Sequence, residues 1–372
     1  MKFNRYALSD LATIKYGKNQ KKVLSESGNI PIYGTGGLMG YATTALYDKP
    51  SVLIGRKGTI GKVKYVEHPF WTVDTLFYTI VNTDIVLPKY LYYVMSLVDL
   101  NNYNEGTTIP SLRTETLNRL EFDIPSLVEQ ETILSCLNPI DEKIALNNAI
   151  NNNLEQQAEA IFQSILSNAI TTVNLGEIAD VKGGKRLPKG VNLTDTPNAH
   201  PYIRVRDLNN ALFASLTPNY AYVDKETQKS ISRYIVSTGD VLISIVGTIG
   251  LTAIVDSTLD KANLTENCVK VTNLKHITPE YLLLYLRSQL GREAIAKGTV
   301  GAVQQKLPIK NIQAIPIPLL SEKDKNALFC TLDSIFAGIS NNVIQSAKLA
   351  SLRDTLLPRL MSSELDVSDI DL

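Results

Sequence analysis

The glycines and lysines of GRKGTIGK, residues 55–62, are the first residues in this 372-residue chain with a pattern that could bind phosphate. A phosphate-binding loop needs four residues between its first glycine and the glycine-lysine pair, followed by Ser or Thr to hold magnesium. Here five residues separate Gly55 from Gly61, and Val63 stands where the hydroxyl is required. A second copy, SIVGTIGL at 244–251, lacks the lysine. We therefore interpret both stretches as tight turns after buried strands.

Other patterns that could carry a reaction are missing from the sequence. YGTGGLMGY, residues 33–41, does not fit the GxGxxG dinucleotide fingerprint, so we interpret it as a flexible loop and leave open whether it touches a ligand. His68, His200 and His276 are scattered, which gives no support for a catalytic triad or a metal cluster. We predict no catalytic residue and no metal ligand.

Basic residues gather beside the glycine-rich stretches of both halves. They are Lys15, Lys18, Lys21, Lys22, Arg56, Lys57, Lys62 and Lys64 in the first half, and Lys182, Lys185, Arg186, Lys189, Arg204 and Arg206 in the second. Cations beside loops that carry Tyr, Asn and Gln suit a surface that holds phosphates and reads base edges. For any single lysine, a solvated charged face is the alternative.

The total charge does not by itself demand a nucleic-acid partner. The chain has 37 basic and 37 acidic residues, and four of the acids lie in the last nine residues, ELDVSDIDL. Without that tail, 37 basic residues face 33 acidic ones, a surplus of four, which argues against strong DNA binding by the chain alone. Three widely spaced cysteines indicate a reducing compartment, and the first ten residues, MKFNRYALSD, lack the apolar run of a signal peptide. With no apolar stretch near membrane-spanning length, we expect a cytoplasmic protein.

The sequence stretches that would position these residues occur twice in the chain. VLIGRKGTIGKV at 52–63 returns as VLISIVGTIGLT at 241–252, an offset of 189. LSDLATIKYGK (8–18) matches LGEIADVKGGK (175–185) at 167, LPKYLYYVM (87–95) matches TPEYLLLYL (278–286) at 191, and DIPSLVEQ (123–130) matches PIPLLSEK (316–323) at 193. The order is preserved and the offset drifts slowly, as loop insertions would cause. We infer a tandem duplication of α+β halves built on short, glycine-punctuated strands.

Each half ends in a long helical segment with a heptad seam. One seam runs through Ile133, Leu137, Ile140, Ile144, Asn147, Asn151, Leu154, Ala158, Ile161 and Ile165, and the other through Leu332, Ile335, Ile339, Asn342, Ser346, Leu349, Arg353, Leu356 and Leu360. Steps of three and four residues are typical of a coiled coil. Some 35 residues would span roughly 50 Å. An amphipathic helix lying on its own domain is the alternative.

Polar seam residues and two prolines qualify this interpretation. Buried polar residues in a seam can fix register, so antiparallel pairing would bring Asn147 near Ser346 and Asn151 near Asn342. Pro139 follows Asn138, so the first helix either starts there or is kinked. Pro358 indicates a kink or fraying near the end of the second helix.

The whole plan resembles the specificity subunit of type I restriction–modification systems. The resemblance is carried by LSDLATIKYGK, VLIGRKGTIGKV and NEGTTIPSLRTETLNRLEFDIPSLVEQETI (104–133), together with their second copies, and it covers residues 1–363. It implies a non-catalytic DNA reader with two tandem, pseudo-symmetric target recognition domains separated by a long antiparallel two-helix coiled coil. Each domain would read one half of a split, asymmetric target in double-stranded DNA.

The resemblance also implies a division of the chain and a set of partners. Recognition domains would occupy 1–126 and 171–319, spacer helices 127–170 and 320–363, and an acidic flexible tail 364–372. The helices would set the spacing and dock two modification subunits carrying out adenine methylation, and restriction subunits would join for cleavage. No cofactor is expected on this chain, whereas S-adenosylmethionine, ATP and magnesium are expected on the partners. No contact with a membrane is expected.

The predicted DNA-binding residues combine the basic clusters with loop residues that differ between the halves. IPSLRTETL of the first half becomes GAVQQKLPI in the second, where base contact is expected. The full set is Lys18, Lys21, Lys22, Tyr33, Thr35, Arg56, Lys57, Lys62, Ser111, Arg113, Lys182, Lys185, Arg186, Lys189, Arg204, Arg206, Gln304, Gln305 and Lys306. Two rivals remain: a coiled-coil protein-interaction scaffold, and an enzyme whose site the sequence does not reveal.

Overall fold

The structure is a computed structural model that describes residues 2–209, 211–302, 304–362 and 364–365. Contacts divide the chain into two compact units, called unit 1 (Met1–Leu146 with Gln345–Leu372) and unit 2 (Asn147–Ile344). Each unit mixes helices and strands and contains one half of each long helix. The division predicted from the sequence, into recognition domains (1–126 and 171–319) and separate spacer helices (127–170 and 320–363), stays a prediction. The predicted acidic tail lies, from residue 366 on, outside the described residues.

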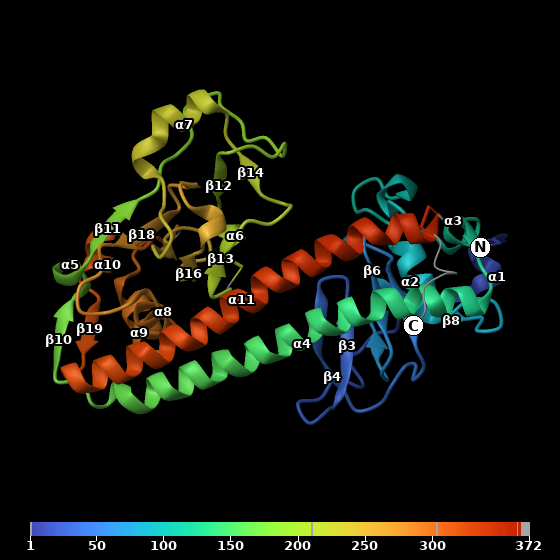
Figure 1. Cartoon of the computed structure of the whole chain (residues 1–372), viewed down its shortest axis with the longest axis horizontal. Coiled ribbons are helices and arrows are strands. Elements are labelled where there is room, and N and C mark those ends of the chain that lie inside the picture. Colours follow the sequence, from blue (N-terminus) through green and yellow to red (C-terminus); the bar gives the residue numbers. More distant parts are fainter. Residues whose placement is uncertain (1, 210, 303, 363, 366–372) are drawn as a thin grey trace. The chain divides into compact units, whose positions relative to one another are not determined.

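The described residues of unit 1 form three small sheets, of which Figure 1 labels the strands β3, β4, β6 and β8. A two-stranded sheet pairs β1 (Asn4–Ala7) with β9 (Glu121–Ile124). The four-stranded sheet has the order β2 (Ala12–Tyr16), β8 (Leu76–Val81), β5 (Ser51–Gly55), β6 (Val63–Val66). The third has the order β4 (Gly37–Ala42), β3 (Ile30–Gly34), β7 (Trp71–Thr72). The short helices are α1 (Leu8–Leu11), α2 (Pro88–Ser96), η1 (Leu100–Tyr103) and α3 (Thr114–Asn118).

Unit 2 repeats these sheets in the same order. β10 (Thr171–Asn174) pairs with β19 (Pro316–Leu319). The larger sheet is β11 (Asp180–Gly183), β18 (Cys268–Thr272), β15 (Val241–Ser244), β16 (Thr252–Val255), extended by β13 (Phe213–Ala214). The third is β14 (Ala221–Tyr222), β12 (Pro201–Ile203), β17 (Asn263–Leu264). This match confirms the predicted tandem α+β repeat.

The helices of unit 2 include the counterparts of those in unit 1 and several more. They are α5 (Leu175–Ile178), α6 (Val205–Leu208), α7 (Lys225–Ile231), η2 (Ser232–Tyr234), η3 (Ser257–Leu259), α8 (Pro279–Arg287), α9 (Gln289–Gly298) and α10 (Ile309–Gln313). α8 matches α2 of unit 1: both begin with proline, and Tyr90 and Tyr281 are buried at the same helical position. Proline is favoured at a first helical turn because its missing N–H has no partner to lose there.

The central strand of each larger sheet forms the core. Every residue of β5 and of β15 is buried, which explains why both share the apolar run Val-Leu-Ile, with one buried serine at an end, instead of alternating. Val52 and Ile54 of β5 belong to the cluster that contains Tyr90 and Leu91 of α2. Val241 and Ile243 of β15 likewise join Tyr281 and Leu282 of α8. Each such aliphatic side chain contributes about 1.5–3 kcal/mol on burial.

The long helices are α4 (Leu127–Leu166) and α11 (Glu322–Met361), each of 40 residues. Reciprocal capping fixes the start of α4, since the Ser126 amide donates to Glu129 Oε2 (2.9 Å) and the Glu129 amide donates to Ser126 Oγ (3.3 Å). A related cap starts α11, where the Asp324 amide donates to Ser321 Oγ (3.2 Å) and the Ser321 hydroxyl donates to Asp324 Oδ2 (3.0 Å). The interpretation that the first helix starts at Pro139 is therefore wrong, because that proline lies inside α4.

The two long helices pack antiparallel within each unit (Figure 1, green and red). In unit 2, Asn342 Nδ2 donates to Asn151 Oδ1 at 2.8 Å, which confirms one predicted polar contact. Asn147 Nδ2 also lies 3.5 Å from the Asn342 carbonyl oxygen. The other expected pair, Asn147 with Ser346, stays a prediction. The predicted seam positions are all buried or half-buried, so the heptad interpretation is confirmed.

The two units differ at one pair of equivalent positions in the seam between the long helices. In unit 1, Arg353 Nη1 donates to Asp141 Oδ1 at 3.0 Å, and the Tyr93 hydroxyl donates to Asp141 Oδ2 at 2.5 Å. At the helix-repeat offset of 195 residues, the counterparts of Asp141 and Arg353 are Phe336 and Ala158. Both are buried in the core of unit 2. One layer of the helix pair is therefore ionic and its mirror image is apolar.

One sequence-based expectation about membranes was too strong. An 18-residue window of α11 reaches a mean hydropathy of 1.3, so this helix is long and apolar enough, by length and composition, to cross a membrane. A single helix of this kind is weak evidence for a span. Leu328, Leu332 and Phe336 of α11 are buried in the core of unit 2, while 22% of the apolar window as a whole is buried.

Candidate nucleic-acid interface

In unit 1, four segments distant in sequence meet at what we call the first loop junction (residues 16–18, 56–58, 72–76 and 105–112). The Lys18 amide donates to the Thr72 carbonyl oxygen at 2.8 Å, and the Arg56 amide donates to that of Thr75 at 2.8 Å. The turn after β5 also holds the last segment, because the Leu112 amide donates to the Arg56 carbonyl oxygen at 2.9 Å. The backbone thus gathers residues predicted from three separate stretches.

Unit 2 builds a second loop junction (residues 183–186, 245–247, 264–268, 300–302 and 304–307) on the same backbone bonds. The Lys185 amide donates to the Leu264 carbonyl oxygen at 2.8 Å, and the Ile245 amide to that of Asn267 at 2.8 Å. The Leu307 amide donates to the Ile245 carbonyl oxygen at 2.9 Å. Arg56 therefore corresponds to Ile245, and Ser111 corresponds to Lys306.

A glycine without room for a side chain stands at the same point of both junctions. A Cβ on Gly17 would lie 2.0 Å from the Val73 carbonyl oxygen, and one on Gly184 would lie 2.0 Å from that of Thr265. Both glycines precede the first lysine of their junction. The backbone can approach this closely only without a side chain, so the glycine of each KYGK or KGGK stretch has a structural reason.

The first junction presents its cations from the turn after β5. The Arg56 guanidinium lies 4.9 Å from the centroid of the Tyr16 ring, which is half exposed, and Arg56 Nη1 donates to the Asp74 carbonyl oxygen at 2.9 Å. Lys57 and Lys18 are exposed. Arg113 is exposed beside the junction and pairs with Glu105 at 3.1 Å. Exposed cations on a rigid backbone are suited to phosphate contacts.

The second junction has an uncharged turn and carries its cations elsewhere. Ile245 and Val246 replace the Arg-Lys pair, while Gln304, Gln305 and Lys306 are exposed on the opposite loop. Arg186 Nε lies 2.8 Å from Glu266 Oε1 while the arginine side chain stays 81% exposed. Burial alone would raise the pKa of Glu266, but hydrogen bonds, with that from Arg186 foremost, outweigh it and hold the pKa below its usual value.

Besides Arg56, Arg113 and Arg186, the predicted residues Tyr33, Arg204 and Lys182 are also engaged in contacts inside their own unit. Tyr33 is buried, its hydroxyl lies 3.1 Å from His68 Nε2, and Lys64 Nζ lies 3.7 Å above its ring. Arg204 donates to both carboxylate oxygens of Asp207, at 2.8 and 2.9 Å. Lys182 pairs with Asp180 at 3.1 Å. We leave Tyr33, Arg204 and Lys182 out of the interface proposed below, and no finding tests whether they touch DNA.

The rest of the predicted set lies outside the junction backbones. Lys21 and Lys22 follow the first junction in a loop, and Thr35 is at the turn of the β3–β4 hairpin. Lys62 lines a small pocket with residues at the end of α2. Lys189 is exposed in a loop, and Arg206 is 71% exposed on α6. Their role in binding stays a prediction.

Sequence reasoning missed several residues that complete the junctions. Tyr16 supports Arg56, Glu266 holds Arg186, and Asn267 supplies a carbonyl oxygen to the second turn. The repeat offers a signal for the last one, because Thr75 occupies the matching place in unit 1. The pairing of Glu266 with Arg186 joins residues 80 positions apart, so no local pattern indicates it.

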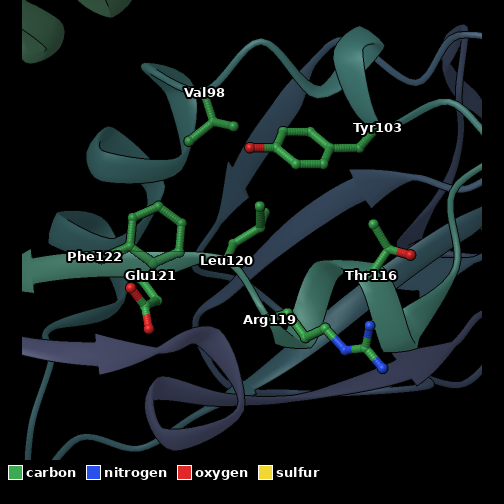
Figure 2. Close-up of a pocket in the computed structure, with 7 residues that line it drawn as sticks. All are labelled: Val98, Tyr103, Thr116, Arg119, Leu120, Glu121 and Phe122. Atoms are coloured by element: carbon green, nitrogen blue, oxygen red, sulfur yellow. The ribbon is translucent and has the colours of Figure 1, made fainter.

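A pocket of about 420 Å³ lies elsewhere in unit 1. Figure 2 shows Leu120 near its centre, with Tyr103 and Val98 on one side and Arg119 on the other. Leu120 and Phe122 also belong to the core cluster of the unit. Among the described residues, no group of three or more His, Cys, Asp or Glu side chains is placed to hold a metal ion. We assign this pocket no ligand.

Comparison with known proteins places the chain in a family. The family described as Type I restriction modification DNA specificity domain matches residues 2–156 and 169–348. The MjaIX type I restriction enzyme specificity subunit of Methanocaldococcus jannaschii is 22% identical over 358 residues, covering 87% of this chain and 80% of that protein. The HindI specificity subunit of Haemophilus influenzae is 32% identical over 113 residues, covering 28% of this chain and 25% of that protein.

A solved structure shows the same fold. The crystal structure of the type I restriction–modification S subunit from M. genitalium aligns with a TM-score of 0.59 at 18% identity. The alignment covers 97% of this chain and 96% of that one.

The repeated fold, the paired long helices and the two loop junctions define a two-module chain whose modules share a framework. The chain belongs to the type I restriction–modification DNA specificity family, and its role is that of a DNA sequence-specificity subunit. Subunits of this family are generally non-catalytic, and the role implies assembly with DNA and with other subunits. The rival interpretation as a general scaffold is set aside.

Proposed function

We propose that each loop junction reads one part of a two-part, asymmetric DNA target. The observation that carries the proposal is that one backbone framework, with the same amide donors, presents different exposed side chains in the two units. A shared framework fits a shared task on a regular duplex. Different exposed polar groups fit different base edges, because base identity is read by side chains in the grooves.

In this proposal the paired helices α4 and α11 set the spacing of the half-sites and dock two modification subunits. Those subunits bring S-adenosylmethionine and methylate adenine, and restriction subunits with ATP and magnesium join for cleavage. The specificity chain itself carries out no reaction and works in the cytoplasm. Its near-zero net charge supports this division, since a chain with few surplus cations needs partners to complete a phosphate clamp.

The proposal is tested by sequencing the methylome of a host that expresses this chain with its modification subunit. The wild-type chain should give a two-part methylated motif. The double variant Ser111→Ala/Arg113→Ala in unit 1 should relax one part of the motif and leave the other intact. Gln304→Ala/Gln305→Ala in unit 2 should do the reverse, with each lost base contact weakening discrimination by about 1–3 kcal/mol.

Loss of both parts together in either variant, with the protein still folded, would contradict independent reading by the two units. A wild-type motif made of one continuous block would contradict the two-part target. As a control, Glu115→Gln changes an exposed charge on α3, close to the first junction in sequence, and should leave the motif unchanged.

A further inference from the structure

The β3–β4 hairpin of unit 1 and the loop before it carry a set of exposed apolar side chains that the loop junction does not use. We call Leu24, Leu38, Met39 and Tyr41 the apolar hairpin patch, and their side chains are 53%, 54%, 56% and 45% exposed. A β-bridge between Leu24 and Ala42 holds the first of them beside β4. Exposed apolar groups that cluster in this way mark interaction sites more often than scattered ones do.

The hairpin is shaped to project its apolar groups. Its pairing register shifts between Ile32 and Tyr33, so the strict alternation of β4 is broken and the adjacent Leu38 and Met39 are both exposed. The turn contains Gly36 and Gly37, and Gly37 has a φ of +113°, which favours glycine. A Cβ at either glycine would meet nothing within 4 Å. The turn of the hairpin is therefore narrow, because Gly36 and Gly37 have no side chains and the first large side chains are those of Leu38 and Met39.

The patch is continuous with the first loop junction. β3 lies between β4 and β7, so the hairpin edge and β7 are about 10 Å apart across two strand spacings. β7 ends at Thr72, which accepts the Lys18 amide. On the face between them, a Cβ on Gly34 would lie 2.4 Å from Met39 Sδ and 3.6 Å from Val73 Cγ2. Met39 thus leans toward the junction.

Positive charge flanks the patch. Lys18, Lys21 and Lys22 are exposed in the loop that leads to Leu24, and no ion pair is found for them in the part of the chain that the structure describes. A stable protein–protein interface buries about 800 Å² on each side, more surface than four side chains supply by themselves. A narrow apolar tip between unpaired lysines matches duplex DNA, which offers phosphates on both sides of an apolar base stack.

We propose that the apolar hairpin patch is a wedge that enters a groove of the duplex beside the first loop junction and partly unstacks one base step. This inference rests on the proposed function. Apolar side chains inserted between base pairs bend DNA and read how easily a step deforms, so the wedge would add specificity through shape. Among the described residues of unit 2 there is no such hairpin, because α6 and β13 come between β12 and β14 in the chain. The wedge would therefore act on one half-site.

The first test replaces Leu38 and Met39 with alanine and sequences the methylome of a host that also expresses the modification subunit. Methylation of the wild-type motif should fall. In binding assays with the wild-type motif we expect roughly tenfold weaker affinity, which corresponds to one disturbed base pair. Leu97→Ala, an exposed leucine of unit 1 outside the patch, is the matched control and should change neither result.

The second test places 2-aminopurine at successive positions of a duplex that carries the wild-type motif. The complex of wild-type chain and modification subunit should raise the fluorescence at one step of the unit 1 half-site, and Leu38→Ala/Met39→Ala should abolish that rise. An unchanged rise, or unchanged affinity and methylation, would overturn the wedge. Failure of the double variant to bind the modification subunit would overturn it too, by making the patch a protein surface. No methylation with the wild-type chain would instead overturn the proposed function.

Discussion

The two loop junctions share their backbone and one exposed lysine, Lys18 in unit 1 and Lys185 in unit 2, but they differ in most other side chains that face solvent. Arg56 and Lys57 of unit 1 become Ile245 and Val246 in unit 2, while Ser111 becomes Lys306. The amides that hold these segments donate to equivalent carbonyl oxygens in both units. Duplication has therefore kept the framework and moved the charge from one side of the junction to the other. The comparison separates the residues that build the shared backbone framework from the exposed residues that we propose contact DNA.

The hairpin region differs even more than the junctions do. In unit 1, β3 and β4 are joined by a tight glycine turn, whereas in unit 2 residues 204–220 separate β12 from β14. Contacts near its two ends and at β13 hold this insertion in place. Arg204 is held by Asp207 and the Asn219 carbonyl oxygen, and β13 pairs with β16 of the larger sheet. The same place in the fold is thus a thin projection in one unit and an anchored lobe in the other.

The largest effect should come from the shared framework, and it should be equal in the two units. Gly17→Ala and Gly184→Ala each place a Cβ 2.0 Å from a backbone carbonyl oxygen, so each should lower the free energy of unfolding by about 2–4 kcal/mol. Urea unfolding followed by circular dichroism measures both.

Gly36→Ala is the control for the glycine variants, since its Cβ would meet nothing within 4 Å. It should change the stability little. If alanine is tolerated at one of Gly17 and Gly184 and not at the other, the two junctions are not equivalent.

The mirrored seam layers should differ in their response to salt. A double-mutant cycle with Asp141→Ala and Arg353→Ala should give a coupling of about 1–2 kcal/mol, because both groups are about three-quarters shielded and hydrogen-bonded. The coupling should fall in 1 M salt. The same cycle with Ala158→Ser and Phe336→Leu in unit 2 should show no salt dependence, since that layer is apolar. A salt-independent coupling at Asp141 would contradict an ionic layer.

Exchanging the turn residues should shift the salt dependence of DNA binding in opposite directions. Lys57→Val removes a cation from the first junction, and Val246→Lys adds one at the matching place in the second. We expect the slope of log affinity against log salt to become shallower by about one for Lys57→Val and steeper by about one for Val246→Lys. Filter binding of the complex with its modification subunit measures this, with Lys143→Val on the exposed face of α4 as control. Equal slopes for all three would remove both turns from the phosphate-binding surface.

The smallest effect concerns the interior of the shared framework. Cys268 accepts the Gly184 amide through its carbonyl oxygen, as Leu76 accepts that of Gly17, and both side chains are buried. Burial raises the pKa of the Cys268 thiol to about 12, so at pH 8 it stays protonated and should react with a thiol reagent far more slowly than the exposed Cys330. Mass spectrometry of the labelled protein checks the order, and rapid labelling of Cys268 would mean that this framework opens.

Sequence alone predicted the repeat, the α+β class and the paired helices, because each leaves a periodic signal. The heptad seam located Asn151 opposite Asn342 from spacing only. The start of α4 was harder to predict, since Asn138-Pro139 mimics a helix start and the true cap at Ser126 depends on Glu129 three residues later. Pro139 is accommodated inside a helix that continues on both sides.

The junctions could be predicted only in part. The lysines and glycines that line them are visible as clusters, but which loops meet is decided by hydrogen bonds between residues tens of positions apart. Tyr33 and Arg204 are residue types that suit DNA contact. In the folded chain, however, Tyr33 is buried and Arg204 forms a hydrogen bond with Asp207. Exposure is a property of the packed chain, and no short pattern encodes it.

The ionic and apolar layers have a consequence for any chain assembled from two copies of one half. Two copies of the first half would set Asp141 against Ala158 at both mirrored positions, leaving each carboxylate without Arg353 in the seam. Two copies of the second half would set Arg353 against Phe336 twice, stranding each guanidinium without Asp141. Helices from two identical halves should therefore pair less stably than α4 pairs with α11. The ionic and apolar layers favour pairing between the two different halves of one chain.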